Sequence, residues 1–229
     1  MRKVVFAEGE FYHVYNRGTD KRAIFLDDQD FARFLQSMIE FNVTDPIGSL
    51  YQHSFINNKN QLRSLAPKLI AVGNETGKLV EIIAYCLNQN HFHLLLKQVS
   101  EHGIARYMQR LGTGYTNYFN HKYERSGSLF QGTFKAIHVD SNEYLLHVSA
   151  YVNLNFRVHG FGSEASKHRG SWEEYMGVMK SKKKERGICN IDPILGQFRN
   201  AREYEKFAEN SLKGTLERRG LLNETILLE

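Results

Sequence analysis

The stretch Asn88-Gln89-Asn90-His91-Phe92-His93-Leu94-Leu95-Leu96 decides the fold, because it places two imidazoles around one large apolar residue in a β-type run. Side chains of a strand alternate between its two faces, so His91 and His93 project to one face and Phe92 to the other. Two groups of the metal-ligand type therefore converge on one side of a strand predicted from His91 to Val99. A histidine pair alone fits a polar pair of the core equally well, so the rest of the chain has to decide.

The residues before this stretch predict a hairpin with it. Residues 78–87 are rich in β-branched and apolar side chains and indicate a strand, and residues 88–90 are its connection to the histidine strand. A first strand is predicted from Glu10 to Asn16, followed by a loop that begins at Arg17. Another strand is predicted from Leu129 to Val139.

Three helices are predicted from apolar residues at three-and-four spacing. The first is capped by Asp27 or Asp28 and continues to about Asn42. The face that it is expected to bury holds Phe31, Phe34, Leu35, Met38 and Ile39. The second helix covers 103–123, where Gly112 and Gly114 each cost ~1 kcal/mol relative to Ala and allow close packing. The third covers 143–158 and is capped by Asp140, Ser141 or Asn142.

This order of elements predicts an α+β fold, a ferredoxin-like antiparallel sheet with helices on one face and a further helix at its end. One domain is expected over residues 1–160, with an insertion at about 43–77, where no apolar period is sustained. Residues 161–229 are predicted to form a basic, mostly helical C-terminal extension. It has helical patterns at 170–180 and 202–213 and a basic run at 180–186.

The composition limits the classes of function that this chain can have. A chain of 229 residues with 41% hydrophobic content can bury a sizeable core, and a net charge of +5 favours a polyanionic partner. Cys86 and Cys189 form no Cys-x-x-Cys pair, so neither a disulfide framework nor a thiolate zinc site is indicated, and a reducing cytoplasm is expected. No apolar run approaches ~18 residues, so neither a membrane span nor a signal peptide is predicted.

A nucleophile and a further ligand type occur together on the third predicted helix. Tyr151 and Asn155 lie four residues apart and share one face, and His147 precedes Tyr151 by four. A cation held by two imidazoles and an amide oxygen keeps its charge and open positions, which suits binding a phosphate oxygen. A tyrosine near such a cation can lose its proton and attack phosphorus. Helix packing is the alternative role for Tyr151.

Six stretches in order complete a pattern that resembles a known family. They are Phe11–Gly18, Asn90–Leu95, Tyr115–Asn120, Gly127–Lys135, Tyr151–Asn155 and Trp172–Tyr175. Over about residues 10–178 this set resembles the HUH single-tyrosine transposases. Within them it is most similar to the REP-associated tyrosine transposases, with their IS200-like domain.

The resemblance implies cleavage of single-stranded DNA by transesterification. Tyr151 would attack a backbone phosphate and leave a 5′-phosphotyrosine bond and a free 3′-hydroxyl, so that strands rejoin without ATP. His91, His93 and Asn155 would hold Mg²⁺ or Mn²⁺. The chain departs from the family at Phe156, where proline often follows the asparagine, and the change is expected to lengthen the helix and shift Asn155.

The implied partner is single-stranded DNA with a hairpin or palindromic repeat, and a homodimer is left open. DNA contacts are expected at Asn16, Arg17, Lys135 and Arg157, and His13 is expected to form a structural hydrogen bond and not to bind metal.

Two other functions remain as alternatives. One is a non-cutting DNA-binding regulator derived from such a transposase, and the other is an HUH replication initiator or relaxase. A zinc protease is disfavoured because no His-Glu-x-x-His is present, and a His-x-His-x-Asp hydrolase because Leu95 takes the place of the aspartate.

Overall fold

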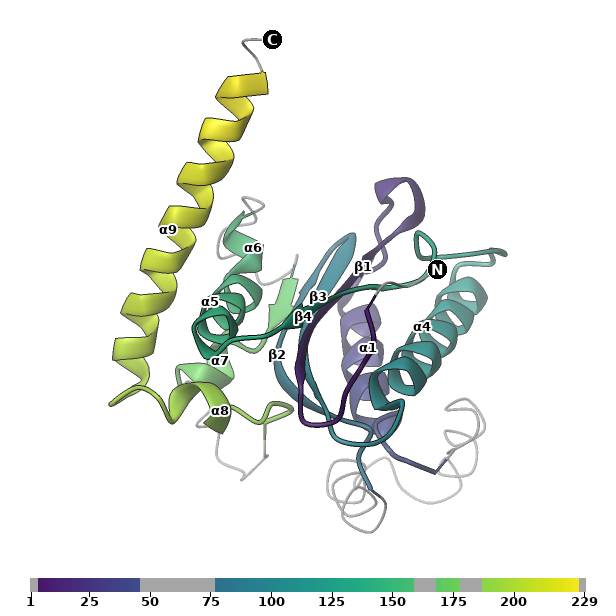
Figure 1. The fold of residues 1–229 in the computed structure, drawn as a ribbon. Coiled ribbons are helices and arrows are strands. Elements are labelled where there is room, and N and C mark those ends of the chain that lie inside the picture. The colour runs from purple at the N-terminus through teal and green to yellow at the C-terminus, as the bar shows by residue number, and fades with distance from the viewer. Residues whose placement is uncertain (1–3, 46–76, 159–167, 178–186, 227–229) are drawn as a thin grey trace.

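The computed structural model describes residues 4–45, 77–158, 168–177 and 187–226 (Figure 1). The basic run predicted at 180–186 lies outside the described residues, as does all of the predicted insertion except 43–45 and 77. The boundary drawn at residue 160 stays a prediction.

Within the described residues, five strands form one antiparallel sheet in the order β4-β1-β3-β2-β5. The strands in chain order are β1 (Phe11–Arg17), β2 (Val80–Asn88), β3 (His91–Gln98), β4 (Lys135–Val139) and β5 (His168–Gly170). The hairpin predicted around the histidine strand is confirmed, because β2 and β3 pair across a turn made by residues 89 and 90. The histidines therefore lie on a central strand.

Helices α1 (Asp28–Glu40) and α4 (Gly103–Lys122) cover one face of the sheet (Figure 1). Helix α1 is capped as predicted, since the Asp27 side chain accepts from the Asp30 backbone N–H in a capping box. The predicted buried face of α1 is confirmed except at Ile39, which is 41% exposed. Ser37 is buried instead, because it follows Phe34 by three residues and lies about 60° from it around the helix, whereas Ile39 follows by five and lies about 140° away.

The opposite face carries the helices that follow β4 (Figure 1). These are α5 (Asn142–Asn153), α6 (Asn155–Val158), α7 (Trp172–Tyr175), α8 (Asp192–Leu195) and α9 (Ala201–Ile226). The α+β antiparallel class is confirmed, but the placement of all covering helices on one face is corrected. Strands β2 and β3 are apolar at consecutive positions, so Ile83 and Leu95 face away from α1 and need a second cover, which α5 supplies.

Two predicted elements are shorter in the structure. The strand predicted from Leu129 begins only at Lys135, because Gly132 has a φ of 67° and bends the chain, while Phe130 makes an isolated bridge to Gly18. The helical pattern predicted at 170–180 starts with Gly170 in edge strand β5 and continues as the short helix α7, and its last residues, 178–180, lie outside the described residues. The pattern at 202–213 is confirmed as part of α9.

The helix predicted over 143–158 is interrupted near its end. Ser141 caps α5, which ends at Asn153, and Leu154 lies outside the helix before α6 starts at Asn155. The lengthening expected from Phe156 in place of proline therefore does not occur. The backbone at Leu154, with φ −105° and ψ 12°, redirects the chain and sets Asn155 against the end of β2.

Candidate active site

The two histidines of β3 lie side by side on the face that α5 covers. The ring centroids of His91 and His93 are 5.2 Å apart, with the rings at 88°. Strand alternation sends Phe92 and Leu94 into the core on the α1 and α4 side. The predicted common face of the two imidazoles is thereby confirmed.

Each imidazole has its Nδ1 beside an acceptor from another residue. His91 Nδ1 donates to Asn90 Oδ1 at 2.6 Å, since Asn90 turns its Nδ2 toward the Lys21 carbonyl. His93 Nδ1 lies 2.8 Å from His13 Nε2 on β1. Burial lowers the pKa of His13 to about 4, so its ring is neutral near pH 7 and can accept this hydrogen bond. The hydrogen bond predicted for His13 is present, and its exclusion from metal binding stays a prediction.

The bond to Asn90 leaves a lone pair on His91 Nε2. A neutral imidazole that donates through Nδ1 has its acceptor at Nε2, the arrangement of most metal-binding histidines. Asn155, fully buried at the start of α6, places its Oδ1 3.2 Å from His91 Nε2. Two ligands at about 2.1 Å on adjacent octahedral positions of Mg²⁺ lie about 3 Å apart. This pair of donors therefore fits a divalent cation.

Asn88, the last residue of β2, completes the polar cluster. Its Nδ2 lies 2.8 Å from Asn155 Oδ1 and 3.0 Å from His91 Nε2. The antiparallel register sets Asn88 directly opposite His91. The sequence analysis assigned Asn88 only to the connection between strands. A two-residue hairpin turn pairs the residues on either side of it, and this rule is the signal that would have found Asn88.

Tyr151 reaches this cluster from α5. Its ring centroid is 5.6 Å from that of His93 and 5.8 Å from that of His13, with both contacts edge to face. The side chain is half-buried, so the hydroxyl-bearing ring lies at the border between the polar cluster and solvent. Helix α5 is fixed there by its packing on β2, β3 and β4.

The other tyrosines are sorted by their positions. Tyr115 and Tyr118 lie on the α4 side of the sheet, where Tyr115 donates to the Ile24 carbonyl and Tyr118 to Asp30. Tyr15 also belongs to the site, since its ring stacks on His93 with centroids 5.6 Å apart. The sequence analysis did not identify it. Period two along β1 places Tyr15 on the same face as His13.

His147 does not join the cluster, although its spacing from Tyr151 suggested that it would. Its Nδ1 lies 2.8 Å from Ser211 Oγ on α9, and its ring packs against Phe207. Four helical residues advance by about 400°, which rotates His147 about 40° away from Tyr151. That rotation places the His147 side chain against Ser211 and Phe207 of α9.

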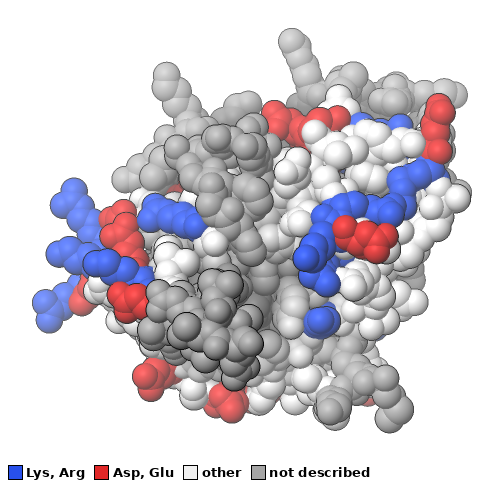
Figure 2. Space-filling model, turned by 90° about the horizontal axis from the view of Figure 1, so that it is seen from above, with Lys and Arg blue, Asp and Glu red and all other residues white. Residues whose placement is uncertain are grey.

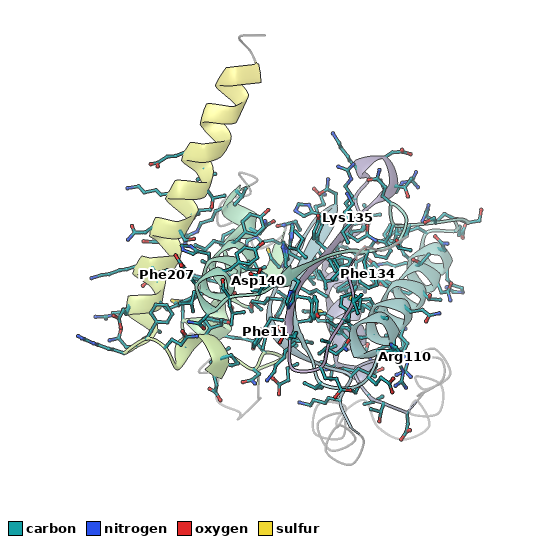
Figure 3. All side chains as sticks on the ribbon, in the orientation of Figure 1. Phe11, Arg110, Phe134, Lys135, Asp140 and Phe207 are labelled. Atoms are coloured by element: carbon teal, nitrogen blue, oxygen red, sulfur yellow. The ribbon has the colours of Figure 1, made fainter. Side chains whose placement is uncertain are left out.

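Three of the four predicted DNA-contacting residues gather at one end of β1. Arg17 is exposed and bonds Gln131, Asn16 donates to the Gly132 carbonyl at 3.2 Å, and Lys135 begins the neighbouring strand β4 (Figure 3). Arg157 is separate from them on α6, where it lies 3.4 Å from Glu209 of α9. Seen from above, Figure 2 shows a band of basic side chains with acidic ones set among them.

The described residues contain neither a cluster of three metal-ligating His, Cys, Asp or Glu side chains nor a membrane-spanning helix. No group of three or more His, Cys, Asp or Glu side chains able to hold a metal occurs there, so a cation at this cluster would depend on amide oxygens beside the two histidines. No helix in the described part of the chain is long and apolar enough to cross a bilayer. The roles of the site residues stay predictions.

This chain is similar to a known family and to a solved structure. Residues 50–155 match a family model described as "Transposase IS200 like". No curated protein matches the chain. Among solved structures, the chain is similar to a REP-associated tyrosine transposase bound to a REP hairpin. The two share 11% identity with a TM-score of 0.49, over 82% of this chain and 88% of that one.

Proposed function

We propose, from the match of residues 50–155 to the IS200-like transposase family model, that the chain belongs to this family and cuts and rejoins single-stranded DNA. The substrate would be DNA with a hairpin or palindromic repeat, and the cofactor Mg²⁺ or Mn²⁺. The observation that carries the proposal is the contact of the Tyr151 ring with His93, on the face where His91 and Asn155 also meet.

The reaction uses one nucleophile and exchanges one phosphate ester for another. The Tyr151 oxygen forms a bond to the phosphorus of a backbone phosphate, and the bond from phosphorus to the 3′-oxygen breaks. The phenol loses a proton and the leaving 3′-oxygen gains one. The product is a 5′-phosphotyrosine, and attack by a 3′-hydroxyl reverses the step without ATP.

His91, His93 and Asn155 would hold the divalent cation. When bound, such a cation polarises the phosphate and neutralises charge that develops on its oxygens. Asn90 keeps the His91 proton on Nδ1, so that the Nε2 lone pair faces the cluster, and the bond to His13 holds the His93 ring in place. Because Tyr151 contacts His93 within one chain, one protomer would contain the whole candidate site.

Tyr151→Phe is the decisive variant, because it removes one oxygen and keeps the ring that packs against His93. We expect wild-type protein to nick a labelled hairpin oligonucleotide in Mg²⁺ or Mn²⁺ and to form an SDS-resistant adduct on the 5′ side of the break. Tyr151→Phe should form neither nick nor adduct, and EDTA should stop the wild-type reaction. Peptide mapping should find the adduct on Tyr151.

Tyr15→Phe is the matched control, because this tyrosine also contacts His93 but lies on β1. It should still form the adduct. An adduct that persists in Tyr151→Phe, or that maps to Tyr15, would show that α5 does not supply the nucleophile. Specific hairpin binding with no nick in either metal would favour the non-cutting regulator.

A further inference from the structure

Asn88 is a fully buried side chain at the centre of the polar cluster, and the proposed reaction gives it no role. It ends β2, opposite His91 and next to His168 of β5, so three strands fix its backbone. A buried amide has to satisfy both of its ends, because an unpaired polar group away from water costs free energy.

The nitrogen end of Asn88 occupies the point where two acceptors meet. Its Nδ2 donates to Asn155 Oδ1 at 2.8 Å and lies 3.0 Å from His91 Nε2. Since His91 carries its proton on Nδ1, Nε2 and Asn155 Oδ1 both present lone pairs, 3.2 Å apart. Two such atoms repel each other unless something electropositive lies between them. In this structure the Asn88 amide hydrogens fill that place.

The oxygen end of Asn88 faces the Cys86 thiol, which can either donate or accept a hydrogen bond. Cys86 Sγ lies 3.7 Å from Asn88 Oδ1 and donates to it. Burial raises the pKa of Cys86 to about 12, so it stays a neutral thiol. A thiol is both a weak donor and a weak acceptor. It can therefore accept from the Asn88 amide nitrogen as readily as it donates to the oxygen.

These contacts give the Asn88 amide a second orientation when a cation lies between the two acceptors. A half turn about its Cβ–Cγ bond exchanges Nδ2 and Oδ1. Oδ1 then lies about 3 Å from His91 Nε2 and Asn155 Oδ1, the spacing of adjacent ligands on Mg²⁺. The amide nitrogen turns toward the Cys86 sulfur at the same time. We propose that Asn88 turns in this way and supplies a further oxygen ligand to the cation, an inference that rests on the proposed function.

Mn²⁺ binding to the full-length protein, measured by calorimetry without DNA, tests this ligand directly. Asn88→Ala should bind Mn²⁺ at least about tenfold more weakly than the wild type. Asn88→Asp keeps an oxygen at the same place and adds charge, so it should bind Mn²⁺ as tightly as the wild type or more tightly. His91→Ala reports on the site as a whole.

Asn42→Ala is the matched control. Asn42 bonds the backbone at the opposite end of β2, where its amide donates to the Val80 carbonyl and accepts from Val80 N–H. The Asn42→Ala variant removes a half-buried amide that contacts the same strand, β2, and it should leave Mn²⁺ affinity unchanged. Circular dichroism melts of all variants identify any that fail to fold.

The outcomes separate this inference from the proposed function. Wild-type affinity in Asn88→Ala overturns the Asn88 ligand and leaves the cation site standing. Equal losses in Asn88→Asp and Asn88→Ala also overturn it, because they assign Asn88 the role of a hydrogen-bond donor. Absence of Mn²⁺ binding in the wild type overturns the cation site itself and this inference with it.

A measurement on the wild-type protein keeps the test valid if Asn88→Ala does not fold. In two-dimensional ¹⁵N spectra, the side-chain NH₂ pair that is missing from Asn88→Asp belongs to Asn88. Mg²⁺ should shift the signals of this NH₂ pair upfield. The reason is that the amide hydrogens exchange the His91 nitrogen and the Asn155 oxygen for the Cys86 sulfur as their acceptor. An Asn88 pair that stays in place while the His91 signals move would contradict the proposed rotation.

Discussion

The two imidazoles of β3 show how single contacts set the chemistry of a residue. His91 and His93 each have Nδ1 against a side chain, Asn90 in one case and His13 in the other. Such contacts choose the tautomer and fix the ring, and they decide which nitrogen is available to a cation. The burial that lowers the pKa of His13 to about 4 also keeps it a neutral acceptor.

His13→Phe removes this acceptor and keeps a ring in the same buried place. We expect Mn²⁺ affinity to fall by about 10- to 100-fold, because His93 is then free to rotate and to change tautomer. Calorimetry on the full-length protein measures the effect. His138→Phe, the same change on β4 where His138 pairs with Glu10, should bind Mn²⁺ normally. If the two variants have equal affinity, His13 does not position His93.

Helix α4 shows how one glycine sets the distance between two elements. A Cβ added at Gly114 would lie 2.6 Å from two ring atoms of Phe41, the C-cap residue of α1. A Cβ added at Gly112 would meet nothing within 4 Å. The predicted role of these glycines in close packing is therefore confirmed for Gly114 and wrong for Gly112.

Substituting each glycine by alanine separates packing from helix propensity. Gly112→Ala should raise the free energy of unfolding by up to about 1 kcal/mol, the helix propensity difference. Gly114→Ala should lower it by about 1 to 2 kcal/mol, because the buried Phe41 ring has to move and overpacking outweighs that gain. Urea denaturation of both variants measures the difference. Equal stabilisation by the two changes would mean that α4 and α1 are not in this close contact.

At the scale of the whole molecule, the segment after α5 supports the helix that carries Tyr151. Edge strand β5 extends the sheet, and α9 packs along α5 (Figure 1). Tyr204 of α9 is buried there, where its hydroxyl accepts from Asn153 Nδ2 at 2.9 Å and lies 3.1 Å from Ser149 Oγ. The predicted extension thus contributes to the position of the candidate nucleophile.

DNA binding by the whole molecule should depend steeply on salt, because phosphate contacts release counterions. Arg17→Ala should reduce the slope of log affinity against log salt concentration by about one, the value of one phosphate contact. Arg199→Ala, an equal loss of charge at the exposed junction before α9, should not change the slope. Fluorescence anisotropy with a hairpin oligonucleotide measures the slopes. Equal slopes in the two variants would exclude Arg17 from the phosphate contacts.

Local backbone geometry explains the features that short sequence patterns predict correctly. Period two placed His91 and His93 on one face, helical period placed Phe31, Phe34 and Met38 in the core, and Asp27 marked the start of α1. Each depends on residues within a few positions of one another, so the signal is contained in a short stretch of the chain. The antiparallel α+β class followed from the order of these elements.

Contacts between residues far apart in the sequence come from the packing of the whole chain. The contact of His13 with His93, the arrival of Asn155 beside His91, and the central position of Asn88 join segments from separate elements. No local period encodes such contacts. They arise because β2 and β3 are apolar on both faces, so the chain has to return and cover the second one, and α5 carries Tyr151 to the histidines when it does so.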